Sequence, residues 1–427
     1  MIVLREHAIG KMPESRRQIR MMTGWIMMFT IPLTAYGFGI VTPAQEQEFI
    51  YSWSCIVGLL GLIVLMACVD ALNSLRLAKV QRKALRDEIF KLMEQSERLY
   101  TIGINHQNRK YDRGIGVTTL DRPVISVGNL STGGTGKTPV VQHVVRTLME
   151  QGHHPAIAMR GYKAKPGQLS DEEREHSSAL VGVPIVAQPD RASGLQELFA
   201  SERGEQIDCV VLDDGFQHRK IARDLDIVLI DASRPPSRDA LLPLGFLRES
   251  AESLSRADVI LITHSEMVEQ SELGMLRGWI ESNTNHDPLV VVGEHAWSSV
   301  DQHDPDGQIT SCPVEILKDQ RVAILTGIGH PESFAEMAVS SGAHVLHRCD
   351  RPDHEEFSIA VLEQFVRDAR SADAILMTMK DWCRLESSGI GANWQSGLPV
   401  YLPRLDINFR SAGEQFHRAC IEAVASR

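Results

Sequence analysis

The chain has 427 residues, of which 43% are hydrophobic and 23% are charged, and its formal net charge is -11. These proportions are typical of a folded protein and exclude an extended disordered chain. The acidic balance disfavours a nucleic-acid partner. Seven scattered cysteines that form no C-x-x-C pair disfavour a disulfide framework and a zinc site.

Two stretches near the N-terminus contain no charged residue, namely residues 24–42 and 50–69. Each is long enough to cross a hydrocarbon core of about 30 Å as a helix. Lys and Arg precede the first stretch and follow the second, so the positive-inside rule predicts a transmembrane hairpin over residues 1–75, with both ends cytoplasmic. A twin-arginine export signal at Arg16 and Arg17 and a hairpin buried in a soluble body are the alternatives.

Residues 76–120 form the predicted connector between this hairpin and the folded body. Within it, residues 77–100 carry many charges, with Leu85, Ile89 and Leu92 at helical spacing, which predicts an amphipathic helix. Such a helix either lies along a membrane or caps the following domain.

Residues 123–152 have the order of a phosphate-binding unit: an apolar β-branched run, a glycine loop, and a helix with valines at helical spacing. Glycines let backbone N–H groups surround phosphate oxygens, and the N-terminus of the helix adds unsatisfied donors. We expect Lys137 to reach the β- and γ-phosphates of a nucleotide and Thr138 to coordinate Mg²⁺. The predicted nucleotide-binding residues are Ser131, Thr132, Gly133, Gly134, Thr135, Gly136, Lys137 and Thr138.

One position departs from the phosphate-loop pattern G-x-x-x-x-G-K-[ST], because Ser131 stands where that pattern has glycine. The alternative is a tight strand-to-helix turn that binds nothing. That alternative leaves Lys137 without a role at the mouth of the turn, so the sequence favours nucleotide binding.

Strands and helices alternate through a phosphate-loop domain that we place at residues 121–290. This alternation predicts an α/β fold of the P-loop NTPase type, in which helices cover both faces of a parallel sheet. A polar stretch at 266–307 is expected to hold a domain junction, and a second, smaller α/β domain is predicted at 308–427. The predicted strands after the phosphate loop are 155–159, 208–212, 226–230, 258–263, 321–326 and 374–377, and the predicted helices of the second domain are 332–341 and 355–372.

The strand at 208–212 is followed by two carboxylates, Asp213 and Asp214. Ligands of open α/β sheets bind beyond the carboxyl ends of the strands. A strand-end aspartate beside a phosphate loop holds or orients Mg²⁺ on a nucleotide. Asp-Asp-Gly is also an ordinary turn sequence, but the neighbouring phosphate loop favours a metal site.

The segments VGNLSTGGTGKTP and DDGFQHR together closely resemble the tetraacyldisaccharide 4′-kinase family of lipid A biosynthesis, whose members use ATP to phosphorylate a membrane-embedded lipid disaccharide. The resemblance extends from Leu99 to the C-terminus. Further matching segments are Arg160-Gly161-Tyr162, Ser170-Asp171-Glu172, residues 242–249, residues 327–331, Asp353-His354 and residues 378–381.

The resemblance implies ATP and Mg²⁺ as cofactors and the lipid A disaccharide precursor as acceptor, with no nucleic acid involved. It implies a bacterial inner-membrane protein whose catalytic body lies on the cytoplasmic face. Asp171 matches the family's proposed catalytic base and His330 its partner, and Lys137 completes the implied catalytic set. Glu173 stands where the family usually has proline, which is a departure in the loop of the base.

The resemblance also implies contacts to phosphate and metal. Arg248 and Glu249 match residues that the family places near both groups, and Arg191 matches a phosphate contact, with a surface arginine at a helix start as its alternative. Gln217 and His218 are expected to orient the two aspartates. The implied metal ligands are Thr138, Asp213, Asp214 and Glu249, and the implied substrate or phosphate contacts are Arg191, Arg248, Gln217 and His218.

Two other functions fit part of the same pattern. A membrane-associated P-loop ATPase or GTPase switch would hydrolyse nucleotide without a lipid acceptor and would give Asp171 and His330 no required role. A non-catalytic membrane scaffold with a degenerate nucleotide site has Ser131 as its support.

Overall fold

The computed structural model describes residues 13–41, 46–133, 135–161, 169–329, 331–352, 357–387 and 397–425. Contacts within the chain define two units, Met1–Ser96 and Glu97–Arg427. Five residues of the motifs above lie outside the described residues: Gly134, Tyr162, His330, Asp353 and His354.

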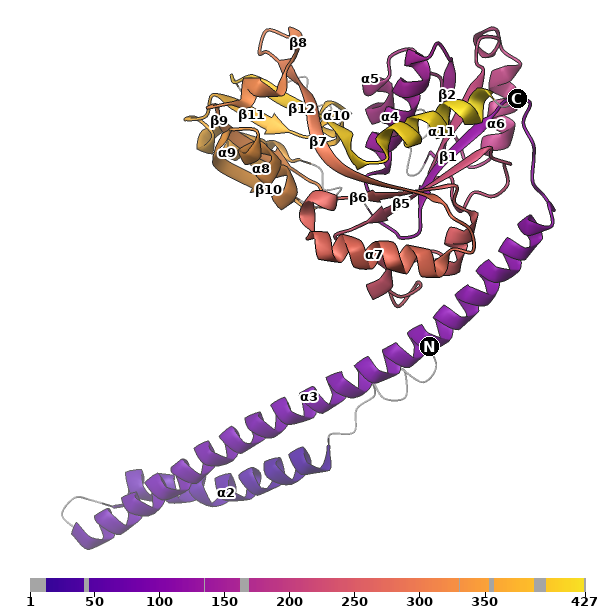
Figure 1. The fold of residues 1–427 in the computed structure, drawn as a ribbon. Helices are drawn as coiled ribbons and strands as arrows, with labels where there is room; N and C mark the ends of the chain where they lie inside the picture. Colours follow the sequence, from indigo (N-terminus) through magenta and orange to yellow (C-terminus); the bar gives the residue numbers. More distant parts are fainter. Residues whose placement is uncertain are drawn as a thin grey trace. The chain divides into compact units, whose positions relative to one another are not determined.

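The first unit contains helix α2 (Glu14–Gly39) and the start of helix α3 (Glu46–Asp112) (Figure 1). The two helices contact each other where Arg20 Nε donates to Asp70 Oδ2 at 3.4 Å. Among the described residues, α3 is the one helix that is long and apolar enough to cross a membrane, judged by length and composition. It continues without a break through the predicted amphipathic helix at 77–100, because neither proline nor a glycine-rich turn interrupts it.

The second unit is built on one sheet, which has twelve strands among the described residues. Its strands follow the order β10-β9-β11-β12-β7-β6-β5-β1-β4-β2-β3, with β8 paired to β7 outside this path. The strands are β1 (Val124–Asn129), β2 (Pro155–Met159), β3 (Ile185–Ala187), β4 (Cys209–Asp213), β5 (Leu225–Asp231), β6 (Val259–Thr263), β7 (Leu289–His303), β8 (Ile309–Cys312), β9 (Arg321–Thr326), β10 (His344–Asp350), β11 (Ala374–Met377) and β12 (Val400–Ser411).

Helices cover both faces of this sheet (Figure 1). Side chains of α4 and α11 pack on one face, and side chains of α7 pack on the opposite face. The helices of the second unit are α4 (Lys137–Glu150), α5 (Asp171–Ala179), α6 (Arg191–Phe199), α7 (Gln270–Asn283), α8 (Pro331–Ser340), α9 (Ile359–Asp368), α10 (Met379–Ser387) and α11 (Gly413–Ala425).

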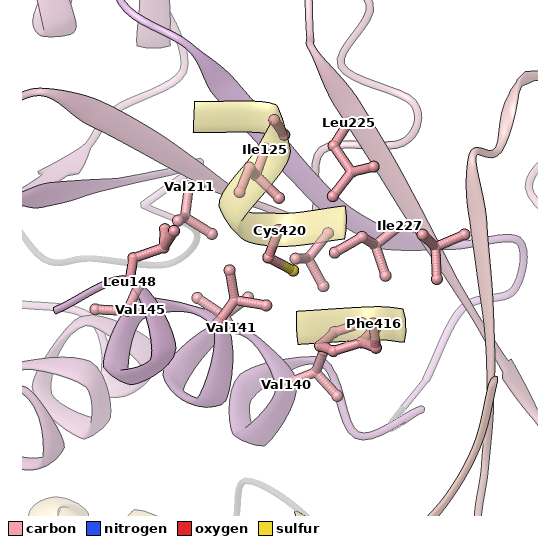
Figure 2. Close-up of a cluster of buried hydrophobic side chains, with 14 of the residues drawn as sticks. Ile125, Val140, Val141, Val145, Leu148, Val211, Leu225, Ile227, Phe416 and Cys420 are labelled. Carbon is pink, nitrogen blue, oxygen red and sulfur yellow. The ribbon is translucent and has the colours of Figure 1, made fainter. Parts of the chain in front are cut away.

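The alternation of side-chain directions along a strand explains why the sheet has a buried core on each face. In β5, Ile227 and Leu229 join the buried cluster beneath α4 and α11, whereas Val228 and Ile230 join the cluster beneath α7. Successive side chains of a strand point to opposite faces, so an apolar run without alternation predicts burial on both. Figure 2 shows the first cluster, in which Phe416 of α11 lies among the valines of α4. Burying each such side chain contributes about 1.5–3 kcal/mol.

Two parallel halves of the sheet meet at a long antiparallel pair, β7 with β12. All the other strand pairs among the described residues are parallel except β7 with β8. The polar stretch at 266–307 contains α7 and β7, so it is part of the sheet as well as the place where the halves join. The last helix, α11, returns to the phosphate-loop half and packs against α4.

The predicted α/β fold, with helices on both faces of a mainly parallel sheet, is confirmed. The sequence analysis missed β7 and β12, because their polar residues interrupt the apolar runs that mark buried parallel strands. β7 and β12 are also the strands that join the two halves of the sheet.

Candidate active site

The phosphate loop connects β1 to α4 and needs glycine at two described positions. Gly133 has φ +117° and Gly136, which caps α4, has φ +78°, and both values lie in the region that favours glycine. A Cβ on Gly136 would lie 2.3 Å from His295 Nε2. Burial lowers the pKa of His295 to about 3, so its imidazole is neutral at pH 7. This neutral ring lies against the backbone of the loop at Gly136.

Neighbouring segments hold the loop in place. Asn129 Nδ2 donates to Thr135 Oγ1 at 2.8 Å, and Thr263 Oγ1 donates to the Thr135 C=O at 3.0 Å. The Thr132 N–H donates to the Phe246 C=O at 2.7 Å. Ser131, the departure from the usual pattern, forms a β-bridge with Leu247.

Five side chains form what we call the phosphate-loop cluster: Asn129, Lys137, Asp214, Gln217 and Arg248. Lys137 Nζ lies 3.2 Å from Asn129 Oδ1 and 3.6 Å from Asp214 Oδ1. An Arg248 Nη donates to both Asp214 oxygens, at 2.9 and 2.7 Å, and to Gln217 Oε1 at 3.3 Å. Gln217 Nε2 donates to the Asn129 C=O at 2.8 Å, which closes the network.

The charges of this cluster are balanced around Asp214. Burial alone would raise the pKa of Asp214, but Lys137 and Arg248 lower it below the ordinary range, so the carboxylate is ionised. One carboxylate therefore holds an ammonium and a guanidinium at the N-terminus of α4. That arrangement suits a polyphosphate, which can take over both cations when it binds.

Asp213, the other strand-end carboxylate, is held by α5. His176 Nε2 lies 3.0 Å from Asp213 Oδ2, and both side chains are buried. Burial would lower the pKa of His176, but the hydrogen bond to Asp213 and the nearby carboxylates raise it above its ordinary value. The contact with His176 thus holds one oxygen of Asp213 in place.

Arg191 and His218 lie beside this network. The buried Arg191 guanidinium donates to the C=O groups of Asp213 at 2.8 Å and Asp214 at 3.2 Å. It therefore braces the strand end and faces two backbone carbonyls. Burial and the nearby cations of Arg191 and Arg223 lower the pKa of His218 to about 4, which leaves it neutral at pH 7.

The predicted metal ligands are only partly brought together. Asp213 ends β4, Asp214 follows it, and Thr138 is in the first turn of α4. Glu249 is buried and accepts hydrogen bonds from Asn108 and Arg256, each at 2.9 Å. Among the described residues, no three His, Cys, Asp or Glu side chains are grouped so as to hold a metal. Two carboxylates and a hydroxyl nevertheless fit Mg²⁺, which usually takes one or two carboxylates together with phosphate and water oxygens.

Asp171 is the first residue of α5, and its position is set by a capping box. The Glu173 N–H donates to Ser170 Oγ at 3.2 Å, and the Ser170 N–H donates to Glu173 Oε2 at 3.3 Å. Glu173, where the family usually has proline, therefore fastens the start of the helix that carries Asp171.

Asp171 belongs to a second group of residues, which we call the Asp171 cluster: Asp171, Gly327, Thr378, Asp381 and Arg384. Arg384 Nε lies 3.8 Å from Asp171 Oδ2, and an Arg384 Nη lies 3.1 Å from Asp381 Oδ1. Asp381 accepts hydrogen bonds from the Gly327 N–H at 3.0 Å and the Thr378 hydroxyl at 2.7 Å. Burial raises the pKa of Asp381. The cluster joins Asp171 to the segment that leads to His330, which itself lies outside the described residues.

The sequence analysis missed several side chains of this site. Four side chains contact predicted site residues although the sequence predicts no role for them. They are Asn129, His176, His295 and Arg384, the last of which contacts Asp171. Asn129 had a usable signal, because it ends a strand directly before a phosphate loop. The other three depend on which strands and helices become neighbours, and a single sequence does not state that.

A cavity of about 260 Å³ lies between the two halves of the sheet, next to these clusters. Its lining includes His295 behind the loop, Glu175 of α5, Ile328 after β9 and Lys380 of α10. The site is thus formed jointly by elements from both halves.

Comparisons with known proteins give one consistent match. A family model described as tetraacyldisaccharide-1-P 4′-kinase matches residues 90–423. The tetraacyldisaccharide 4′-kinase of Anaeromyxobacter sp. (strain K) is 34% identical over 298 residues, which are 65% of this chain and 76% of the relative. The enzyme of that name from Chlorobium luteolum is 32% identical over 315 residues, which are 69% and 86% of the two chains.

A solved structure with bound ATP is similar to most of the chain. It is a crystal structure of LpxK from Aquifex aeolicus in complex with ATP, and its sequence is 27% identical. The match has a TM-score of 0.59 and covers 80% of this chain and 99% of the other.

Proposed function

The chain belongs to the tetraacyldisaccharide-1-P 4′-kinase family, and we propose how its residues perform the reaction. It is an ATP-dependent kinase that transfers the γ-phosphate to the 4′-hydroxyl of tetraacyldisaccharide 1-phosphate in lipid A biosynthesis. Relatives named for this transfer favour the kinase over a P-loop switch without a lipid acceptor.

The phosphate-loop cluster binds and polarises the triphosphate. Lys137 leaves Asp214 for the β- and γ-phosphates, and Arg248 likewise turns to the phosphates and stabilises charge on the transferred group. The observation that carries this proposal is the pairing of both cations with one ionised carboxylate at the N-terminus of α4. Charge is then in place before the reaction, which lowers the cost of reorganisation.

Asp213, Asp214 and the Thr138 hydroxyl are the residues that would hold Mg²⁺. The ion supplies neutralisation of charge on the phosphates when it is bound. His176 holds one oxygen of Asp213, so the orientation of that carboxylate is fixed by α5. Glu249, predicted as a further ligand, is already engaged by Asn108 and Arg256, and we give it a supporting role.

Asp171 acts as the general base. Its side chain is 37% exposed, and its contact to Arg384, at 3.8 Å, is long enough to leave the carboxylate available to a ligand. The 4′-hydroxyl gives its proton to Asp171 as its oxygen forms the new bond to the γ-phosphorus, and the bond from that phosphorus to the β,γ-bridging oxygen breaks to release ADP. His330 would assist this proton transfer, as the family resemblance implies.

The N-terminal helices anchor the enzyme to the bacterial inner membrane, with the second unit on the cytoplasmic face where ATP is present. Support comes from the apolar composition of α3 and from the exposed apolar side chains of the first unit, such as Ile31, Phe38 and Val64. Basic residues flank the uncharged stretches at 24–42 and 50–69, as expected for two spans with cytoplasmic ends.

The experiment is to incubate the full chain in detergent micelles with ATP, Mg²⁺ and tetraacyldisaccharide 1-phosphate, and to measure ADP and lipid product by mass spectrometry. One mole of bisphosphorylated lipid should form for each mole of ADP. ADP formation at the same rate without the lipid would contradict the proposal and support a hydrolytic switch. Omission of Mg²⁺ should abolish product formation.

A further inference from the structure

The end of helix α3 contacts the segment that carries Arg248 and Glu249. Tyr100 Oη donates a hydrogen bond to the Arg248 C=O at 3.0 Å. Asn108 Nδ2 donates to Glu249 Oε2 at 2.9 Å. Tyr100 and Asn108 are about two helical turns apart, and both side chains lie on the broad face of α3 that meets this segment. Both belong to the unit Glu97–Arg427, which also holds the phosphate loop.

The contacted segment is fastened to the phosphate loop by its backbone. The Arg248 N–H donates to the Leu130 C=O at 2.7 Å, and the Phe246 C=O accepts from the Thr132 N–H at 2.7 Å. The Arg248 side chain then reaches Asp214 at 2.7 Å. A shift of this segment would therefore move both the loop and the guanidinium of Arg248.

Asn108 is itself held in place by Arg219, which lies in the segment after β4. An Arg219 Nη donates to the Asn108 C=O at 3.2 Å, and the other Nη donates to Asp112 Oδ1 at 2.7 Å. Arg219 is the last residue of the DDGFQHR segment that supplies Asp214. The end of α3 is thus bonded both to the strand-end segment and to the Arg248 segment.

The burial of Glu249 explains why its hydrogen bond from Asn108 matters. Only 2% of the Glu249 side chain is exposed, and its Oε2 accepts hydrogen bonds from Asn108 and Arg256, each at 2.9 Å. A buried carboxylate is costly unless donors satisfy it. If Asn108 no longer donates, Glu249 is expected to rotate and to move the adjacent Arg248.

We propose that Tyr100 and Asn108 are positioning residues for phosphoryl transfer, which set the place of Arg248 and of the phosphate loop through the segment 246–249. The inference rests on the proposed function, because that function puts Arg248 at the phosphates. Neither residue needs to touch ATP or lipid for this role.

The first test compares two variants that each lose one hydroxyl. Tyr100→Phe removes the hydrogen bond to Arg248, whereas Thr101→Val removes a hydroxyl that donates to the Glu97 C=O of the same helix. Tyr100→Phe should lower the kcat of lipid phosphorylation by about three- to tenfold and leave the KM for lipid unchanged, as expected for the loss of one hydrogen bond that acts on the transition state. Thr101→Val should leave kcat unchanged.

The second test compares two amide-to-acid changes on neighbouring residues. Asn108→Asp replaces the donor to Glu249 with a like charge, whereas Gln107→Glu changes an exposed side chain that bonds to Tyr111. Asn108→Asp should lower kcat by tenfold or more, and Gln107→Glu by less than twofold. Melting temperatures are measured for all four variants.

The proposal is overturned if Tyr100→Phe and Asn108→Asp both keep kcat within twofold of the unaltered enzyme. It is also overturned if the two control variants lose as much activity as their partners, since that pattern would report general damage to α3. If the unaltered chain phosphorylates no lipid, the proposed function fails instead. ATP affinity then decides the inference, because it should be weaker in Tyr100→Phe than in Thr101→Val.

Discussion

The phosphate-loop cluster and the Asp171 cluster lie in one site but are built differently. In the former, contacts run from 2.7 Å for Arg248 to Asp214 to 3.6 Å for Lys137 to Asp214. In the latter, Arg384 and Asp381 form a buried pair at 3.1 Å, while Asp171 meets Arg384 at 3.8 Å and stays 37% exposed.

This difference matches the tasks of the two clusters. Charges that bind phosphates act best when they are fixed before the nucleotide arrives. A general base has to receive a proton from an incoming hydroxyl, so it must not be satisfied by a protein partner. In the proposed mechanism, the nucleotide side is preformed and the acceptor side is left open for a lipid headgroup.

The largest effect is expected from removing the ammonium of the preformed side. Lys137→Ala should lower the rate of lipid phosphorylation by about a hundred- to a thousandfold, the usual loss for one preorganised charge. Lys318→Ala, at an exposed lysine, is the control and should keep full activity. A Lys137→Ala enzyme with more than a tenth of the original rate would contradict the role of the cluster.

A smaller effect is expected from changing the shape of the loop while keeping its charges. Gly136→Ala combines left-handed strain with a contact to His295 and should weaken ATP binding by about tenfold or more, from strain of about 1–2 kcal/mol plus the clash. Gly152→Ala has the same type of strain, φ +88°, with no neighbour within 4 Å. It should lower the melting temperature slightly and leave ATP affinity unchanged. Equal ATP affinity in the two variants would show that the His295 contact does not shape the loop.

The smallest effect concerns the pH dependence of stability. The pKa of His176 is raised in the folded protein, so its pairing with Asp213 stabilises fully below the unfolded value of about 6.5 and is lost as pH rises through the folded-state pKa. The difference in unfolding free energy between the unaltered protein and His176→Asn should be larger at pH 6 than at pH 9. His154→Asn, at an exposed histidine, should show no such trend. A His176→Asn difference that is equal at both pH values would mean that the pKa of His176 does not change on folding.

The two clusters also differ in how far a sequence predicts them. Lys137 and Asp214 belong to segments in which residue type and local order define the chemistry, so the sequence alone predicts both. Arg384 lies more than 200 residues from Asp171 along the chain, and their contact depends on the packing of α10 against α5. The role of His176 is not predictable for the same reason. It lies on a charged helix, and the sequence gives no sign that its partner is Asp213, a buried residue of β4.

The fold shows the same limit. Apolar runs predicted the parallel strands β1, β4, β5 and β6, because burial on both faces requires continuous hydrophobic sequence. The long pair β7 and β12 is not predicted by such runs, although it joins the half that carries Asp171 to the half that carries Arg384. The antiparallel pairing that brings Arg384 into the same site as Asp171 is a long-range property of the chain.

The central claim is that the preformed side binds ATP and that Asp171 acts on the acceptor. The most direct test measures ATP affinity and transfer of labelled γ-phosphate to tetraacyldisaccharide 1-phosphate for Asp171→Asn beside the unaltered enzyme. We predict unchanged ATP affinity and a loss of lipid labelling of about a hundredfold or more, the usual contribution of a general base. Lipid labelling within a few fold of the unaltered enzyme, or a parallel loss of ATP binding, would contradict the division of labour between the two clusters.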